Sequence, residues 1–206
     1  MHELISKCQK SLITVDKYYD AALQHVRGEL IVNGKLNLKV KIIICNKKNA
    51  LGIKMFEKYS FKNKVLDIDS YADKKTYNLD LEKALNPEFN EYLILCGYMS
   101  KIPNHIIQAY NGNVINIHPS LLPKYKGLDT HKNVLDNNEK YHGVTVHFVD
   151  NTLDGGPICA QSKMLVETED IESLEESIHK LEYDIYPRVI YDIAHGKVSL
   201  NNGKVI

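Results

Sequence analysis

Two polar side chains in the second half of the chain have the types and the spacing that acyl-transfer chemistry uses. Asn116 and His118 stand two residues apart at the end of the apolar run 114–117, which predicts a buried strand, so both point to the same side of a sheet. An amide N–H donates to a developing oxyanion, while an imidazolium donates a second hydrogen bond or a proton. The pair therefore indicates a general acid–base site.

Asp154 is the third candidate, because it opens the turn Asp-Gly-Gly-Pro at residues 154–157. Two glycines there allow close approach of the backbone, so the carboxylate can orient His118 and accept a proton through water. Taken singly, a histidine at a strand end or an Asp-Gly-Gly-Pro turn is more often structural. The functional interpretation rests on the three residues together.

The elements that must position these residues alternate between strands and helices from Leu38 onward, a pattern typical of parallel sheets crossed over by helices. We expect strands at residues 40–45, 65–68, 92–96, 114–117, 144–149 and 158–166. We expect helices at residues 49–59, 73–85, 103–110 and 171–194. Residues 4–6 are a candidate short strand and residues 16–26 a candidate helix. No repeat or linker divides the chain, so we predict a single domain over residues 1–206.

Composition excludes several classes of partner. Lys plus Arg and Asp plus Glu are equal at 26 each, so no net field attracts nucleic acid or an anionic membrane. The apolar runs are far shorter than the ~20 residues that span a bilayer. The start of the chain has no signal-peptide pattern, so we expect a cytoplasmic protein. The four cysteines are widely spread and lack zinc-ligand spacing, so no metal is expected.

The ordered motifs resemble the folate-dependent formyltransferase family over residues 38–195. The blocks that carry the resemblance are LCGYM at 95–99, NIHPSLLPKY at 116–125, HGVTVHFV at 142–149 and LDGGP at 153–157. The resemblance implies an α/β fold: a Rossmann-like, mostly parallel sheet flanked by helices, with an antiparallel carboxy-terminal strand extension.

The resemblance also implies an activity. The donor would be 10-formyltetrahydrofolate, and the acceptor would be the amino group of glycinamide ribonucleotide, in de novo purine biosynthesis. In this scheme Asn116 and His118 stabilise the tetrahedral oxyanion, and Asp154 supports the protonated His118 and helps to remove the amine proton. The expected partners are small-molecule substrates, and the expected assembly is a monomer or homodimer.

Substrate-binding positions follow from the same resemblance. Those that match the folate pocket are Met99, Ser100, Lys101, Ile102, Asn116, Asp150, Asn151, Thr152, Leu153 and Asp154. Glu182 falls where the family places a carboxylate against the ribose hydroxyls, a sensible pairing for vicinal hydroxyls. Lys10 and Ser11 are candidates for the acceptor phosphate.

The amino-terminal segment, residues 1–37, diverges from the family pattern. The family usually has a Gly-Asn-Gly-Ser-Asn loop after the first strand, whose amides bind phosphate. Residues 7–11, KCQKS, contain no glycine where that loop would align. Other departures are Ser100 in place of a common Arg, and Lys126 and Asp129 in place of Pro and His.

Several functions remain open. One alternative is formyl transfer to another small amine, such as an amino sugar nucleotide. Another is a folate-binding relative without acceptor activity, against which all three candidate catalytic residues argue. Formyltetrahydrofolate hydrolysis is disfavoured because such hydrolases usually carry an additional amino-terminal domain, and this sequence is too short to contain one. Methionyl-tRNA formylation is disfavoured because a basic carboxy-terminal domain is absent.

Overall fold

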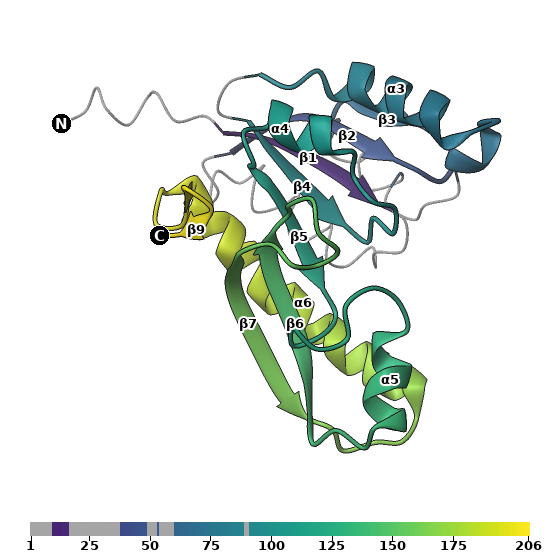
Figure 1. Ribbon diagram of the computed structural model, residues 1–206, viewed down its shortest axis with the longest axis vertical. Coiled ribbons are helices and arrows are strands. Elements are labelled where there is room, and N and C mark those ends of the chain that lie inside the picture. The colour runs from purple at the N-terminus through teal and green to yellow at the C-terminus, as the bar shows by residue number, and fades with distance from the viewer. Residues whose placement is uncertain (1–9, 17–37, 49–52, 54–59, 89–90) are drawn as a thin grey trace. The chain divides into compact units, whose positions relative to one another are not determined.

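A computed structural model describes residues 10–16, 38–48, 53, 60–88 and 91–206. The chain divides into two compact units, Met1–Val114 and Ile115–Ile206. Each unit has its own strands and helices (Figure 1).

The first unit contains a parallel sheet. Its strands are β1 (Lys10–Asp16), β2 (Leu38–Cys45), β3 (Asn63–Val65) and β4 (Tyr92–Cys96). β1 pairs in parallel with both β2 and β4, and β2 pairs in parallel with β3, which gives the order β3-β2-β1-β4. All five residues of β4 are buried, as expected for a strand covered on both faces.

The helical elements whose bounds lie within the described residues of this unit are the 3-10 turn η2 (Ile68–Ser70), α3 (Lys74–Leu85) and α4 (Asn104–Ala109). α3 begins where the Asp73 carboxylate accepts a hydrogen bond from the Thr76 N–H, and it ends at Asn86, which is left-handed with φ 38°. Its apolar face is fully buried and consists of Tyr77, Leu81 and Leu85.

Three expectations for this unit need correction. Lys10 and Ser11 open β1, so they do not stand in a loop after the first strand. The expected strand 65–68 is also wrong, because β3 ends at Val65 and Ile68 starts η2. Asp16 ends β1 rather than opening a helix. The candidate strand 4–6, the rest of the candidate helix 16–26 and, apart from Ile53, the expected helix 49–59 lie outside the described residues.

The second unit is built on antiparallel strands. β5 (Val114–His118), whose first residue closes the first unit, pairs with β6 (Tyr141–Phe148), and β6 pairs with β7 (Ile158–Leu165). The other elements are α5 (Thr130–Asp136), α6 (Ile171–Ala194), β8 (Leu200–Asn201) and β9 (Lys204–Val205). Figure 1 shows α6 running along β6 and β7.

α6 has the bounds expected from the sequence. Its first turn is capped by Asp170, whose carboxylate accepts from the Ser173 N–H, and Pro187 lies inside the helix. The Tyr186 hydroxyl, fully buried, donates to the carbonyl oxygen of Ile115 at 3.2 Å. This bond ties the helix to β5 three residues before His118. The α/β class, the parallel strands and the antiparallel carboxy-terminal extension are therefore confirmed.

Candidate active site

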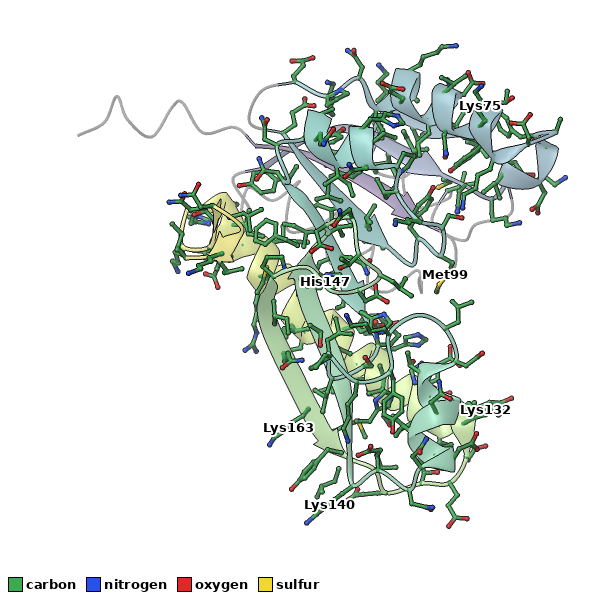
Figure 2. The ribbon with its side chains drawn as sticks, in the orientation of Figure 1. Lys75, Met99, Lys132, Lys140, His147 and Lys163 are labelled. Carbon is green, nitrogen blue, oxygen red and sulfur yellow. The ribbon has the colours of Figure 1, made fainter. Side chains whose placement is uncertain are left out.

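The site is built on the pairing of β5 with β6. Asn116 lies opposite His147, and His118 lies opposite Thr145. Residues directly opposite in an antiparallel pair project to the same side, and so do residues two apart on one strand. Four polar side chains therefore share one face of the second unit. Figure 2 labels His147, and it labels Lys140 and Lys163 at the other end of the β6–β7 ribbon.

The contact between Asn116 and His147 sets the direction of the Asn116 amide. His147 Nδ1 lies 2.8 Å from the carbonyl oxygen of Phe148, so this nitrogen carries the proton and donates. Burial lowers the pKa of His147, which keeps the ring neutral and leaves Nε2 as an acceptor. Asn116 Nδ2, at 3.3 Å from that Nε2, is therefore the donor. The second N–H of the amide points elsewhere.

His118 has an oxygen acceptor beside each ring nitrogen. Nε2 lies 2.9 Å from the carbonyl oxygen of Tyr125, and Nδ1 lies 3.5 Å from Oδ2 of Asp154. The side chain of His118 is buried. Two acceptors suit a ring that carries both protons.

Asp154 is held in place by backbone geometry. Its φ is 43°, a left-handed value that Asp tolerates better than most residues. Its Oδ2 accepts a hydrogen bond of 2.8 Å from the N–H of Gly127. Oδ1 lies 3.8 Å from Nε2 of His147, but this contact is no ion pair, because that nitrogen is an unprotonated acceptor. The carboxylate therefore serves His118.

The turn that carries Asp154 is compact. Asp150 accepts hydrogen bonds from both the N–H and the hydroxyl of Thr152, at 2.8 and 2.6 Å. Gly156 passes so close to β6 that a Cβ there would lie 2.0 Å from the carbonyl oxygen of Phe148. Only glycine allows this approach, which explains the second of the two glycines after Asp154.

The loop after β5 is anchored on the neighbouring strands. The Thr145 hydroxyl donates to the carbonyl oxygen of Ser120 at 2.7 Å and accepts from the N–H of Leu122 at 3.1 Å. Gln161 on β7 donates to the Leu122 carbonyl oxygen and to the Thr145 hydroxyl, at 2.9 and 2.8 Å. These bonds hold the chain that leads from His118 to Tyr125.

The predicted residues divide between the two units. Asn116, His118 and Asp154 come together in the second unit, and Asp150 to Leu153 precede Asp154 in the same turn, with Leu153 exposed. Glu182 on α6 is 3% exposed, so it is not a solvated helix residue. Met99 to Ile102 follow β4 in the first unit; Met99 is exposed and Ile102 buried. Lys10 and Ser11 also belong to the first unit, in β1.

Sequence reasoning missed His147, Thr145 and the Tyr125 carbonyl. The alternation in residues 144–148 places Thr145 and His147 on one face, and an antiparallel partner for β5 would have put that face beside Asn116. The Tyr125 carbonyl had no signal, because backbone groups do not appear in a pattern of side chains.

Among the residues that the structure describes, no three His, Cys, Asp or Glu side chains are grouped so that they could hold a metal ion. None of the helices found in that part of the chain is long and apolar enough to cross a membrane.

Comparison with known proteins identifies the class. A model of the formyl transferase family matches residues 21–190, and the chain belongs to this family. Phosphoribosylglycinamide formyltransferase of Bacillus subtilis (strain 168) is 36% identical over 162 residues, which cover 78% of this chain and 81% of the relative. The enzyme of the same name from Escherichia coli (strain K12) is 32% identical, with 81% and 79% covered.

The fold agrees with this assignment. The crystal structure of glycinamide ribonucleotide transformylase 1 from Symbiobacterium toebii matches with a TM-score of 0.87 at 26% identity, and covers 97% of this chain and 94% of that one. The family resemblance inferred from the motifs is confirmed.

Proposed function

We propose that this chain transfers the formyl group of 10-formyltetrahydrofolate to the amino group of glycinamide ribonucleotide. The observation that carries the proposal is the position of His118, which contacts Asp154 through one nitrogen and stands two residues from Asn116. Relatives named phosphoribosylglycinamide formyltransferase support this choice of acceptor.

The first step is attack of the acceptor amine on the formyl carbon. The C=O electron pair moves to oxygen, which becomes an oxyanion. The second N–H of Asn116 donates to it, since the first is bonded to His147. Of the His118 nitrogens, Nε2 is held by Tyr125 at 2.9 Å, whereas the 3.5 Å contact of Nδ1 is longer than an ordinary hydrogen bond. Nδ1–H is therefore the donor that turns to the oxyanion.

The second step is collapse of the tetrahedral intermediate. The oxyanion re-forms the C=O bond, the bond between the formyl carbon and N10 of the folate breaks, and N10 takes up the proton that Asp154 has accepted from the acceptor amine. The proton lost by the amine passes through water to Asp154, whose position is set by Gly127. The products are tetrahydrofolate and the N-formyl acceptor.

Substrate contacts remain part of the proposal. Residues 150–154 consist of Asp154, which carries the catalytic carboxylate, and the four residues before it. This position supports their assignment to the folate. Residues 99–102 are assigned to the folate on the motif alone. Glu182 is assigned to the ribose hydroxyls, and its burial supports a specific role over a solvated one.

A second candidate function is formyl transfer to a different small amine. The observation that favours it is the chain after β1: residues 17–27, which directly follow Asp16, contain no glycine. A glycine-rich loop after the first strand is the family's means of binding the acceptor phosphate.

A panel of acceptors tests the proposal. The purified protein is supplied with 10-formyltetrahydrofolate and, in separate reactions, with glycinamide ribonucleotide, an amino sugar nucleotide or no amine. Tetrahydrofolate release is followed by absorbance and the product by mass. We expect the mass of glycinamide ribonucleotide alone to increase, by that of one formyl group. Formylation of the amino sugar nucleotide, or tetrahydrofolate release without an amine, would contradict the proposed acceptor.

A further inference from the structure

The carbonyl group that contacts His118 comes from a residue in an unfavourable backbone conformation. Tyr125 has a φ of 53°, in the left-handed region that costs a residue with a side chain roughly 1–2 kcal/mol. This conformation goes with a carbonyl oxygen that lies 2.9 Å from Nε2 of His118. Other contacts of Tyr125 must therefore stabilise this backbone conformation.

The Tyr125 side chain is held by Glu139, which lies 14 residues further along the chain, in the turn before β6. The tyrosine hydroxyl donates to Oε1 of Glu139 at 2.8 Å, and Lys124 Nζ lies 2.6 Å from the same oxygen. Hydrogen bonds from Lys124 and then Tyr125 lower the pKa of the Glu139 carboxyl, and the bond to Glu139 raises the pKa of the Tyr125 hydroxyl. One carboxylate thus binds two consecutive side chains of the loop.

Glu139 is itself well placed. Its backbone N–H donates to the carbonyl oxygen of Val134 at 3.1 Å, which ties the turn to the end of α5. Its side chain is 25% exposed, so the bonds are only partly screened by solvent. On the other side of Tyr125, the Ser120 hydroxyl donates to the carbonyl oxygen of Lys124 at 2.8 Å. Hydrogen bonds therefore hold the loop at both Lys124 and Tyr125.

We propose that Glu139 is a positioning residue for formyl transfer: through Lys124 and Tyr125 it aims the Tyr125 carbonyl at Nε2 of His118. This contact keeps the proton on Nε2 and turns Nδ1 toward Asp154 and the reacting oxygen. Glu139 touches neither substrate nor reacting atoms. The inference rests on the proposed function, because it assigns His118 a part in the reaction.

The experiment compares Glu139→Ala, Glu139→Gln and Tyr125→Phe with the wild-type chain, and it has two readouts. The first is kcat and KM for formyl transfer. The second is the imidazole Nε2–H proton of His118 in ¹⁵N-edited NMR spectra, assigned with His118→Asn. Asp170→Ala is the control for stability, because loss of a helix cap costs about 1 kcal/mol and the Asp170 carboxylate accepts from Ser173 in the first turn of α6.

We expect Glu139→Ala and Tyr125→Phe to lower kcat about tenfold with KM changed less than about threefold, because the geometry and not substrate binding is affected. We expect the Nε2–H signal to be protected from exchange in the wild type and to disappear in both variants. Glu139→Gln should stay within about threefold of wild type, because the amide oxygen still accepts from Tyr125. Asp170→Ala should leave kcat and the signal unchanged.

Two results would overturn the inference: kcat within twofold of wild type with the signal intact, or an equal loss of kcat in Asp170→Ala. Should Glu139→Ala fail to fold, Tyr125→Phe decides, because it removes one hydroxyl only. A wild-type chain that formylates no acceptor would refute the proposed function, while the Nε2–H signal still tests the contact between Glu139, Tyr125 and His118.

Discussion

Asn116 and His147 face each other across the β5–β6 pair, with 3.3 Å between Nδ2 and Nε2. The bond from His147 Nδ1 to the Phe148 carbonyl makes Nε2 an acceptor, so the Asn116 amide has one stable orientation. In that orientation its nitrogen, and not its oxygen, is the atom available to an oxyanion. The hydrogen bond to His147 thus fixes the orientation of the Asn116 side-chain amide.

Replacing His147 by Phe should therefore weaken catalysis without removing a catalytic group. The ring fills similar space but offers no acceptor, so the amide is free to turn. We expect kcat to fall about tenfold, against a loss of about 10²- to 10³-fold for Asn116→Ala, which removes the donor itself. Steady-state kinetics on both variants checks the order. A His147→Phe variant as active as wild type would show that the contact does not orient Asn116.

Asp154→Asn isolates the charge of the carboxylate. Asparagine tolerates the left-handed φ of 43° at this position, and its side-chain oxygen still accepts from Gly127, so the fold should persist. Without the negative charge, His118 loses its partner and the amine proton its acceptor. We expect kcat to fall at least about 10²-fold, with the unfolding midpoint within a few degrees of wild type. Retained activity would exclude Asp154 as the proton acceptor.

Acid should destabilise the second unit through a pair of histidines, His131 and His142, of which His142 is buried. His131 Nδ1 lies 3.0 Å from His142 Nε2, and burial, followed by repulsion from His131 and His118, lowers the pKa of His142 to about 4. Burial also lowers the pKa of His131, which Glu175 and His179 of α6 influence with opposite signs. The His142 pKa is thus below its ordinary value of 6.5.

The direction of this pH effect on stability follows from the number of protons that the folded and unfolded chains bind. Between pH 6.5 and about 4 the unfolded chain binds more protons at His142 than the folded chain, so stability falls as the pH falls through this range. The loss is on the order of 3 kcal/mol by pH 4. Denaturant unfolding at about pH 7.5, 6.5, 5.5 and 4.5 measures this loss in the wild type and in His142→Gln, whose side chain cannot take up a proton. An equally steep pH dependence in His142→Gln would assign the effect to other groups.

Two glycine substitutions should separate packing from backbone strain. Gly156→Ala places a Cβ 2.0 Å from the Phe148 carbonyl oxygen, and neither backbone can yield easily. We expect a loss of more than about 2 kcal/mol in unfolding free energy, and lower activity because Asp154 precedes it in the turn. Gly203→Ala meets no atom within 4 Å but keeps a φ of 73°, so it should cost about 1 kcal/mol and leave kcat unchanged. Thermal unfolding and kinetics compare the two; equal effects would contradict the packing argument.

Prediction from the sequence succeeded where an apolar pattern is compatible with only one type of secondary structure. The wholly apolar run at β4 and the capped amphipathic stretch at α6 lie where the patterns indicated. Prediction failed where polar residues enter a strand. β1 contains Lys10 and Ser11, and their parallel pairing with Leu38 and Lys39 of β2 overrides their low strand propensity.

The candidate site shows the same division. Spacing along one strand identified Asn116 and His118, because the period of two is a local property. Glu139 and the Tyr125 carbonyl were not predictable, since their role depends on a left-handed residue and on contacts between a loop and a distant turn. α5 was also missed, because the short stretch 130–136 begins with a left-handed Asp129 and has no side-chain cap.

The most direct test of the account is the single-turnover rate of formyl transfer from 10-formyltetrahydrofolate to glycinamide ribonucleotide, in wild type and His118→Asn. With both substrates saturating, product formation is followed by rapid quench and mass spectrometry. The account predicts that the variant binds both substrates with little change and transfers the formyl group at least about 10²-fold more slowly. A variant that transfers the formyl group within a few-fold of the wild-type rate would contradict it.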